Sequence, residues 1–144
     1  RFQMIGRREG IPPEVWQSIN STMEKTQSNT GMVLNMAFNY GGRLEIIDGV
    51  KSIAQDVKSG RLDVEDISEE TISRSLYTHG LPDPDLLIRT SGEQRISNFL
   101  LWQLSYAEFY FTDKCWPDFN RDEFQKAITE YQSRERRYGG VNGS

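Results

Sequence analysis

The segment from Arg89 to Asn98 holds the residues whose types and spacing are best suited to chemistry. It places Arg89 and Arg95 six positions apart, with a serine, a glycine and a glutamate between them. Guanidinium groups offer forked N–H donors that match phosphate oxygens, and a glycine lets backbone N–H groups approach the same ligand. We expect Ser97 to add a hydroxyl and to open a helix whose N-terminal end favours an anion. The segment predicts a phosphate or diphosphate site, with solvated surface arginines as the alternative.

Two carboxylates near this segment have both a chemical and a structural interpretation. Glu93 lies between the two arginines, so it serves either as a salt-bridge partner or as a catalytic group. Glu108 lies among tyrosine and phenylalanine residues, where an unpaired carboxylate is expensive to bury. It therefore caps a backbone amide, pairs with an arginine, or holds a magnesium ion that also binds a diphosphate. The residue types alone leave these alternatives open.

An apolar stripe lies earlier in the chain. Its members are Met32, Leu34, Met36 and Phe38, which alternate and therefore point to one side of a single strand. A stripe of this kind is ordinarily part of the core. A wall for a long apolar substrate is the second interpretation, because such a substrate needs the same kind of surface.

Strand and helix patterns alternate along the chain, and these elements must position the residues above. The expected strands cover residues 2–5, 32–38, 86–88 and 109–112. Four helices are expected. One follows the Pro12-Pro13 pair, and a second runs from Arg43 to a cap at Gly60. A third begins after Ser68, and a fourth begins at a capping box that starts with Asn120. The alternation predicts an α/β fold with a mostly parallel sheet flanked by helices. In such sheets ligands bind beyond the carboxyl ends of strands, where residues 39–42 and Arg89 fall.

The composition limits the class of protein. The 144 residues carry a formal net charge of -4, with a pI near 5.1. This argues against nucleic acid as a partner, since binding its backbone needs a basic surface. A single cysteine excludes an intrachain disulfide and favours a cytoplasmic setting, and no apolar run is long enough for a membrane-spanning helix. With one histidine and one cysteine, any metal is expected to be a hard ion held by oxygens.

The run from Arg89 to Gln103, followed by Glu108 and Trp116-Pro117, closely resembles the cis-prenyltransferases, the family that includes undecaprenyl diphosphate synthase. The likeness continues through residues 31–35, 39–43 and 136–140, and it covers nearly the whole chain. It implies the cis-prenyltransferase α/β fold. It also implies condensation of isopentenyl diphosphate onto an allylic diphosphate such as farnesyl diphosphate, which yields a polyprenyl diphosphate of the undecaprenyl type. The expected enzyme is a cytoplasmic, magnesium-dependent homodimer that meets the membrane surface through its lipid product.

The resemblance assigns roles to the residues of the first motif. It implies that Arg89, Arg95 and Ser97 bind the diphosphate of isopentenyl diphosphate and act in catalysis. It implies that Glu108 is a catalytic residue that helps to hold magnesium. Glu93 matches a position of the pattern to which we assign only structural support.

The resemblance also assigns residues outside that motif. Arg137 and Gly139 match an Arg-x-Gly motif that reaches across the dimer interface toward the active site of the partner. Met32 and Met36 fall where the family has residues in the wall of an apolar product tunnel. All four are therefore expected to be substrate-binding residues.

Two further segments of the family have no match in residues 1–32. They are an Asp-Gly-Asn-Arg-Arg-Trp segment, whose aspartate is central to catalysis, and a Phe-Ser-x-Glu-Asn-Trp segment. We expect residues 1–138 to be the C-terminal part of a single domain, incomplete at its N-terminus and inactive alone, and residues 139–144 to be a flexible tail. A non-catalytic accessory subunit is the alternative, although it would not need the arginines. A generic phosphate-binding module would not explain the Arg-x-Gly motif.

Overall fold

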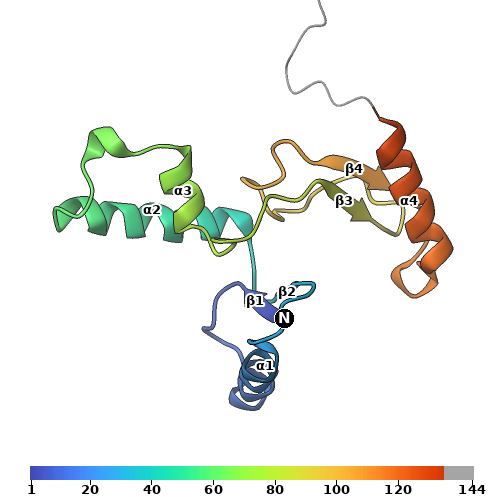
Figure 1. Ribbon diagram of the computed structural model, residues 1–144, viewed down its shortest axis with the longest axis horizontal. Helices are drawn as coiled ribbons and strands as arrows, with labels where there is room; N and C mark the ends of the chain where they lie inside the picture. The colour runs from blue at the N-terminus through green and yellow to red at the C-terminus, as the bar shows by residue number, and fades with distance from the viewer. Residues whose placement is uncertain (135–144) are drawn as a thin grey trace, which may run out of the picture. The chain divides into compact units, whose positions relative to one another are not determined.

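The computed structural model describes residues 1–134, and Figure 1 labels their helices and strands. The chain divides into two compact units. The first unit covers Arg1–Leu81, and the second begins at Pro82. The first unit contains β1 (Phe2–Ile5), α1 (Pro13–Thr26), β2 (Leu34–Ala37), α2 (Gly42–Lys58), a 3-10 turn (Val64–Asp66) and α3 (Glu69–Ser75). The second contains β3 (Leu86–Arg89), β4 (Glu108–Phe111), a 3-10 turn (Trp116–Asp118) and α4 (Arg121–Ser133).

Both strand pairs are parallel, as the alternation of strands and helices predicted. In the first unit β1 pairs with β2, from Phe2 opposite Leu34 to Ile5 opposite Ala37. Helix α1 makes the crossover and packs on β1, where Ile5 and Ile19 are buried. Parallel strands need a crossover of this kind because their ends cannot be joined by a tight turn. The prediction of an α/β fold with parallel strands is confirmed.

The end of α2 follows the predicted glycine cap. Gly60 has a φ of +72°, its N–H donates to the carbonyl of Val57 at 3.0 Å, and the N–H of Arg61 donates to the carbonyl of Asp56 at 2.9 Å. These two bonds form a Schellman motif, which satisfies carbonyls of the last helical turn. The cap therefore follows directly from the position of one glycine in the sequence.

The spacing of Ile46, Val50, Ile53 and Val57 predicts one buried apolar face on α2, and the structure differs from this prediction. Ile53 is buried as expected, but Val50 is 57% exposed, and Gly49 lies on the buried side instead. A Cβ at Gly49 would lie 3.2 Å from the carbonyl oxygen of Ser75. Helix α2 turns this glycine toward α3 because the backbone of α3 approaches so closely. Apolar periodicity alone does not reveal such a contact.

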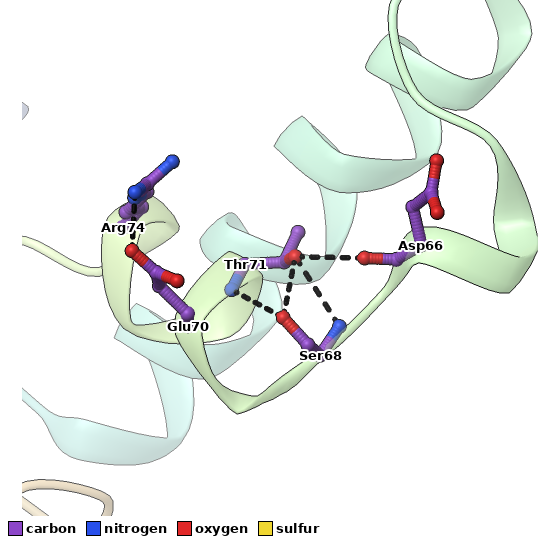
Figure 2. Close-up of polar contacts among 5 residues, drawn as sticks. All are labelled: Asp66, Ser68, Glu70, Thr71 and Arg74. Carbon is purple, nitrogen blue, oxygen red and sulfur yellow. Dashed lines mark hydrogen bonds and ion pairs between the residues drawn. The ribbon is translucent and has the colours of Figure 1, made fainter.

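Helix α3 begins at a capping box (Figure 2). The hydroxyl of Ser68 accepts a hydrogen bond from the N–H of Thr71 at 3.3 Å, and the hydroxyl of Thr71 accepts one from the N–H of Ser68 at 3.2 Å. Glu70 and Arg74 form an ion pair one turn apart on the exposed side of the helix. The predicted cap at Ser68 is confirmed, and it satisfies N–H groups that the first turn would leave unpaired.

Strand β2 is present as predicted, but its apolar stripe is not buried. Met32 is 80% exposed and Leu34 is 58% exposed, and Phe38 is also exposed. Helix α1 makes its main strand contact with β1. Within residues 1–134, the stripe therefore remains open to solvent, and the prediction of a buried strand is wrong for β2.

The second unit builds a short parallel pair covered by one helix. Strand β3 pairs with β4, from Leu86 opposite Glu108 to Arg89 opposite Phe111, and α4 packs on β4 through the fully buried Ala127. Asn120 caps α4, and its side chain accepts from the N–H groups of the first turn. The predicted capping box is incomplete, because the Glu123 carboxylate pairs with Lys126 at 2.6 Å instead.

The connection from β3 to β4 contains no helix, which corrects the expectation that one opens at Ser97. The backbone is left-handed at Ser97, Asn98 and Leu100, with φ values of +48°, +63° and +45°. A right-handed helix cannot start through such residues, so residues 97–106 form successive turns. Part of this segment is buried, through Leu100, Gln103 and Leu104. No helix among residues 1–134 is both long enough and apolar enough to cross a membrane.

Candidate functional site

The predicted arginine segment begins at the carboxyl end of the β3–β4 pair. Arg89 is the last residue of β3, and its carbonyl accepts a hydrogen bond from the N–H of Thr112 at 3.0 Å. The turn that follows is tied to the chain beyond β4. Ser91 donates its N–H to the carbonyl of Lys114 at 2.8 Å, and Gly92 donates to the carbonyl of Thr112 at 2.9 Å. The first arginine thus stands on a firmly anchored backbone, at the strand end where α/β proteins bind ligands.

Gly92 suits this turn for two reasons. Its φ of +68° lies in the left-handed region, and a Cβ there would lie 3.1 Å from Oδ1 of Asp113. Asp113 therefore stands beside the arginine segment, although the sequence reasoning did not single it out. Asp113 lies near Gly92 because β3 pairs with β4 in parallel. A prediction of the register between those strands would have been needed to place it there.

Arg89 and Ser97 come together as expected, but Arg95 has a different partner. Nη1 of Arg89 donates to Oγ of Ser97 at 3.2 Å, which leaves the serine O–H able to donate to a ligand. Arg95 forms an ion pair with Glu93, two residues earlier. Among residues 1–134, no hydrogen bond or ion pair joins the Arg89–Ser97 pair to the Arg95–Glu93 pair. The helix dipole expected at Ser97 is absent, because no helix begins there.

A cavity of about 380 Å³ opens next to Arg89. Its polar lining includes Arg89, Ser91 and Glu93, and its apolar lining includes Leu87, Ile96 and Phe99. A cavity whose lining combines a cationic group with apolar side chains suits a small ligand with an anionic head and an apolar body. Glu93 thus faces the cavity and also pairs with Arg95.

Glu108 lies at the opposite end of the strand pair from Arg89. Glu108 is the first residue of β4 and stands opposite Leu86. Leu86 precedes Arg89 by three residues, so Glu108 and Arg89 are separated by roughly 10 Å along the strands. Its Oε2 lies 2.8 Å from Nη1 of Arg134, and Arg134 also pairs with Glu130 at 2.5 Å. These hydrogen bonds, chiefly the one to Glu108, raise the pKa of Arg134. Of the alternatives for Glu108, the structure shows the arginine pair.

Metal-ligating side chains do not gather around Glu108. Across residues 1–134, no three histidine, cysteine, aspartate or glutamate side chains form a group that could hold a metal ion. Glu108 is a single carboxylate, and its partner Arg134 is shared with Glu130. These residues by themselves do not make up a magnesium site.

The other predicted residues lie elsewhere. Met32 and Met36 belong to the first unit, where Met32 is exposed just before β2 and Met36 is half-buried within it. Arg137 and Gly139 lie outside the described residues.

A second polar cluster, which the sequence reasoning missed, lies at the carboxyl ends of β1 and β2. Arg7 makes two hydrogen bonds to the Asp48 carboxylate, at 2.8 and 2.6 Å, and Tyr77 donates a third. The bonds from Arg7 and then from Tyr77 lower the pKa of Asp48 below its ordinary 3.8. The three residues lie on separate segments, 41 and 29 positions apart, so no local pattern links them.

Further polar contacts around this cluster hold the turn after β2 in place. The side chain of Asn39, whose φ is +49°, donates to the carbonyls of Arg7 and Glu9 at 3.1 and 2.8 Å. Glu45 is buried and accepts from the Tyr40 hydroxyl at 2.5 Å and from the N–H of Tyr77 at 2.9 Å. Residues 39–42, which the sequence marked as a loop beyond a strand, are therefore fixed by polar contacts.

The parallel strand pairs and the arginine-lined cavity at a strand's carboxyl end define an α/β protein with a candidate site for an anion. Comparison with known proteins identifies the family. A prenyltransferase family model described as undecaprenyl diphosphate synthase matches residues 1–139, and the chain belongs to this cis-prenyltransferase family. The resemblance found in the sequence is confirmed.

Curated relatives support this membership. The chain is 53% identical over 141 residues to an isoprenyl transferase of Clostridium perfringens, a match that covers 98% of this chain and 56% of the relative. An isoprenyl transferase of Oceanobacillus iheyensis is 54% identical, with the same coverage of 98% and 56%. The chain therefore spans little more than half the length of these relatives.

Solved structures support the fold. Lavandulyl diphosphate synthase from Lavandula x intermedia, solved with dimethylallyl diphosphate, matches with a TM-score of 0.94 at 41% identity, over 96% of this chain and 60% of that one. A probable undecaprenyl diphosphate synthase from Campylobacter jejuni matches with a TM-score of 0.82 at 36% identity, over 96% and 62% of the two chains. The fold of this chain is that of part of a cis-prenyltransferase.

Proposed function

We propose that this chain belongs to an enzyme that elongates prenyl chains, condensing isopentenyl diphosphate onto an allylic diphosphate such as farnesyl diphosphate. The observation that carries the proposal is the cavity at the end of β3, which combines Arg89 with apolar side chains. Arg89 binds the diphosphate of isopentenyl diphosphate, and Ser97, already in contact with Arg89, donates its hydroxyl to the same group. The apolar lining receives the isopentenyl group. Arg95 is the third residue proposed for the diphosphate.

The names of similar proteins support this choice of chemistry. The curated relatives are isoprenyl transferases, and the structure from Lavandula x intermedia contains an allylic diphosphate, dimethylallyl diphosphate. Both point to isoprenoid diphosphates as the substrate class. We propose a polyprenyl product of the undecaprenyl type, following the description of the matching family model.

In the proposed reaction the allylic C–O bond breaks and releases the allylic diphosphate as pyrophosphate. The isopentenyl double bond then attacks the allylic cation, a new C–C bond forms, and the resulting cation loses a proton to give the new double bond. The diphosphate bound near Arg89 does not leave, and it becomes the diphosphate of the longer product. Arg89 and Ser97 hold it in place, which converts an encounter of two substrates into a reaction of oriented groups.

Magnesium is the proposed cofactor of the complete enzyme, where it would stabilise charge on the leaving diphosphate. Glu108 is the carboxylate proposed for it, and two observations weigh against a site in one copy of this chain. Glu108 is paired with Arg134, and it lies at the amino end of β4, away from Arg89. We therefore derive no step of the reaction through the metal. Manganese binding that is lost in Glu108→Gln, measured by electron paramagnetic resonance, would support the role of Glu108.

The proposal extends to the assembly. We propose a homodimer in which Arg137 and Gly139 of one copy contribute to the substrate site of the other, and a tunnel for the growing chain with Met32 and Met36 in its wall. The exposure of Met32 is consistent with a surface that other parts of the complete enzyme cover. The proposed enzyme acts in the cytoplasm and approaches the membrane surface through its lipid product.

Radiolabelled chain elongation tests the proposal. The 144-residue chain is assayed with isopentenyl and farnesyl diphosphates, alone and mixed with the part of the Clostridium perfringens relative that it does not match. We expect product only from the mixture. Activity of the chain alone would contradict the expectation that it is inactive by itself. A mixture whose activity is unaffected by Arg89→Gln and Arg95→Gln in this chain would favour a non-catalytic accessory subunit.

A further inference from the structure

Glu93 places a carboxylate where the proposed site needs positive charge. It pairs with Arg95, and it lines the cavity beside Arg89. We propose that Glu93 is an internal counter-ion, which occupies Arg95 while no diphosphate is bound and which the incoming diphosphate displaces. This inference rests on the proposed function, because it assumes that a diphosphate enters this cavity.

The exposure of the pair suits a contact that is made and broken. The side chains of Arg95 and Glu93 are 62% and 39% exposed, so water screens their attraction and little stability is lost when they separate. Arg7 and Asp48 differ, because two hydrogen bonds join them and both side chains are more buried. The Arg95 pair is thus the more readily displaced of the two.

The charge of Glu93 opposes a bound diphosphate as well as competing for Arg95. At a separation of about 6 Å in water, one carboxylate weakens binding roughly threefold for each unit of ligand charge. A diphosphate carries more than one negative charge, so the expected total effect is roughly tenfold. No carboxylate of the described residues pairs with Arg89. Glu93 therefore lowers the affinity of Arg95 for the diphosphate, whereas Arg89 stays available to bind it.

The proposed reaction explains why weaker binding of the diphosphate would be useful. The diphosphate that enters with the isopentenyl group remains on the longer product. Before the next addition it must leave the isopentenyl position, because in that addition it becomes the allylic leaving group. A carboxylate that returns to Arg95 assists this departure. Glu93 would therefore raise the rate of repeated additions at the cost of weaker initial binding.

Pyrophosphate binding to the 144-residue chain tests the inference by isothermal titration calorimetry in metal-free buffer. Glu93→Gln keeps the shape of the side chain and removes its charge, and it should tighten binding roughly tenfold. Glu70→Gln is the matched control, because it also removes a carboxylate from an exposed pair with arginine (Figure 2). That control should leave the affinity unchanged.

A second variant tests whether Glu93 acts through Arg95. In an Arg95→Gln background, Glu93→Gln should tighten binding less than it does in the unaltered chain, since only the direct repulsion remains. Equal effects in the two backgrounds would overturn the competition for Arg95. In the elongation mixture, Glu93→Gln should lower both the KM for isopentenyl diphosphate and kcat.

The outcomes separate this inference from the proposed function. Unchanged pyrophosphate affinity in Glu93→Gln would overturn the counter-ion role, and weaker affinity would instead make Glu93 a residue that orients Arg95. Both results leave the arginine site intact. If the unaltered chain does not bind pyrophosphate, or binds it equally well after Arg89→Gln, the proposed function itself fails.

Discussion

Arg89 and Arg95 have the same side chain but different surroundings. Arg89 ends a strand, and its backbone is hydrogen-bonded to the neighbouring segment, whereas Arg95 lies in a turn-rich connection. Arg89 contacts a neutral hydroxyl, and Arg95 contacts a carboxylate. Arg89 is therefore the better organised of the two for binding an anion, because less order has to be created when the ligand arrives.

At the scale of the residue, we predict that Arg89→Gln weakens pyrophosphate binding at least tenfold. A charge-assisted hydrogen bond contributes about 1.5–3 kcal/mol, and a glutamine cannot replace the paired donors of a guanidinium. Calorimetric titration of the chain measures the change. Arg74→Gln is the control, because it removes an exposed arginine that pairs with Glu70 in the first unit. Equal losses in both variants would indicate a general effect of charge.

At the scale of the element, helix α3 depends on its cap. It is a seven-residue helix, and short helices are marginal without support from their ends and from packing. The Ser68 and Thr71 hydroxyls satisfy two N–H groups at its start. Helix α3 in turn packs on α2 over Gly49, so the cap supports the contact between the two helices.

Ser68→Ala should therefore destabilise the chain by about 1 kcal/mol, the usual effect of losing a serine cap. Urea denaturation followed by circular dichroism gives the free energy of unfolding. Ser18→Ala is the matched control, because Ser18 lies within α1 and its hydroxyl bonds back to the carbonyl of Glu14. Alanine favours a helix interior, so this control should be neutral or slightly stabilising. Equal destabilisation by both changes would argue against the importance of the cap.

Much of the element structure could be predicted from local sequence. The alternation of apolar residues located β1 and β2. The proline pair marked the start of α1, Gly60 marked the end of α2, and Ser68 marked the start of α3. The predictions failed where a segment distant in the sequence determines the local structure. Gly49 faces α3 because another chain segment approaches it, and Ser97 adopts a positive φ in a turn whose neighbours are partly buried.

The candidate site followed the same division. Arg89, Arg95 and Ser97 could be proposed from the sequence because they lie together in one short segment of the residue types that suit a phosphate. Asp113 could not, since it approaches Gly92 only through the pairing of β3 with β4. The Arg7–Asp48 contact could not be predicted for the same reason, and neither could the pairing of Glu108 with Arg134, because 26 positions separate those two residues in the chain.

At the scale of the whole molecule, the Arg7, Asp48 and Tyr77 cluster joins three segments of the first unit. It links the end of β1 to α2 and to the chain that follows α3. Burial and the hydrogen bond to Asp48 raise the pKa of Tyr77, while the pKa of Asp48 is lowered. Asp48 is therefore ionised throughout the neutral range, and the cluster keeps its charge balance there.

This cluster predicts an acid-sensitive contribution to stability. Because folding lowers the pKa of Asp48, its contribution is present above the ordinary value of 3.8 and is lost as the pH falls below it. Asp48→Asn should cost roughly 1 kcal/mol at neutral pH, a modest value because the pair is partly exposed. The variant should also lose less stability than the unaltered chain between pH 5 and pH 3, by part of that roughly 1 kcal/mol, because the loss is complete only below the lowered pKa of Asp48. Denaturation curves across this range measure both effects, and parallel pH profiles for the two proteins would refute the assignment.

The turn at Ser91 and Gly92 has a consequence for the order in which the second unit acquires its structure. Both N–H groups donate to carbonyls about twenty residues further along the chain, at Lys114 and Thr112. Neither bond exists before β4 lies against β3, so the backbone of the arginine segment cannot form ahead of the strand pair. The amide hydrogens of these two residues should consequently be protected from exchange to the same degree as those within β4, and native-state hydrogen exchange tests whether the proposed anion site opens together with the strand pair.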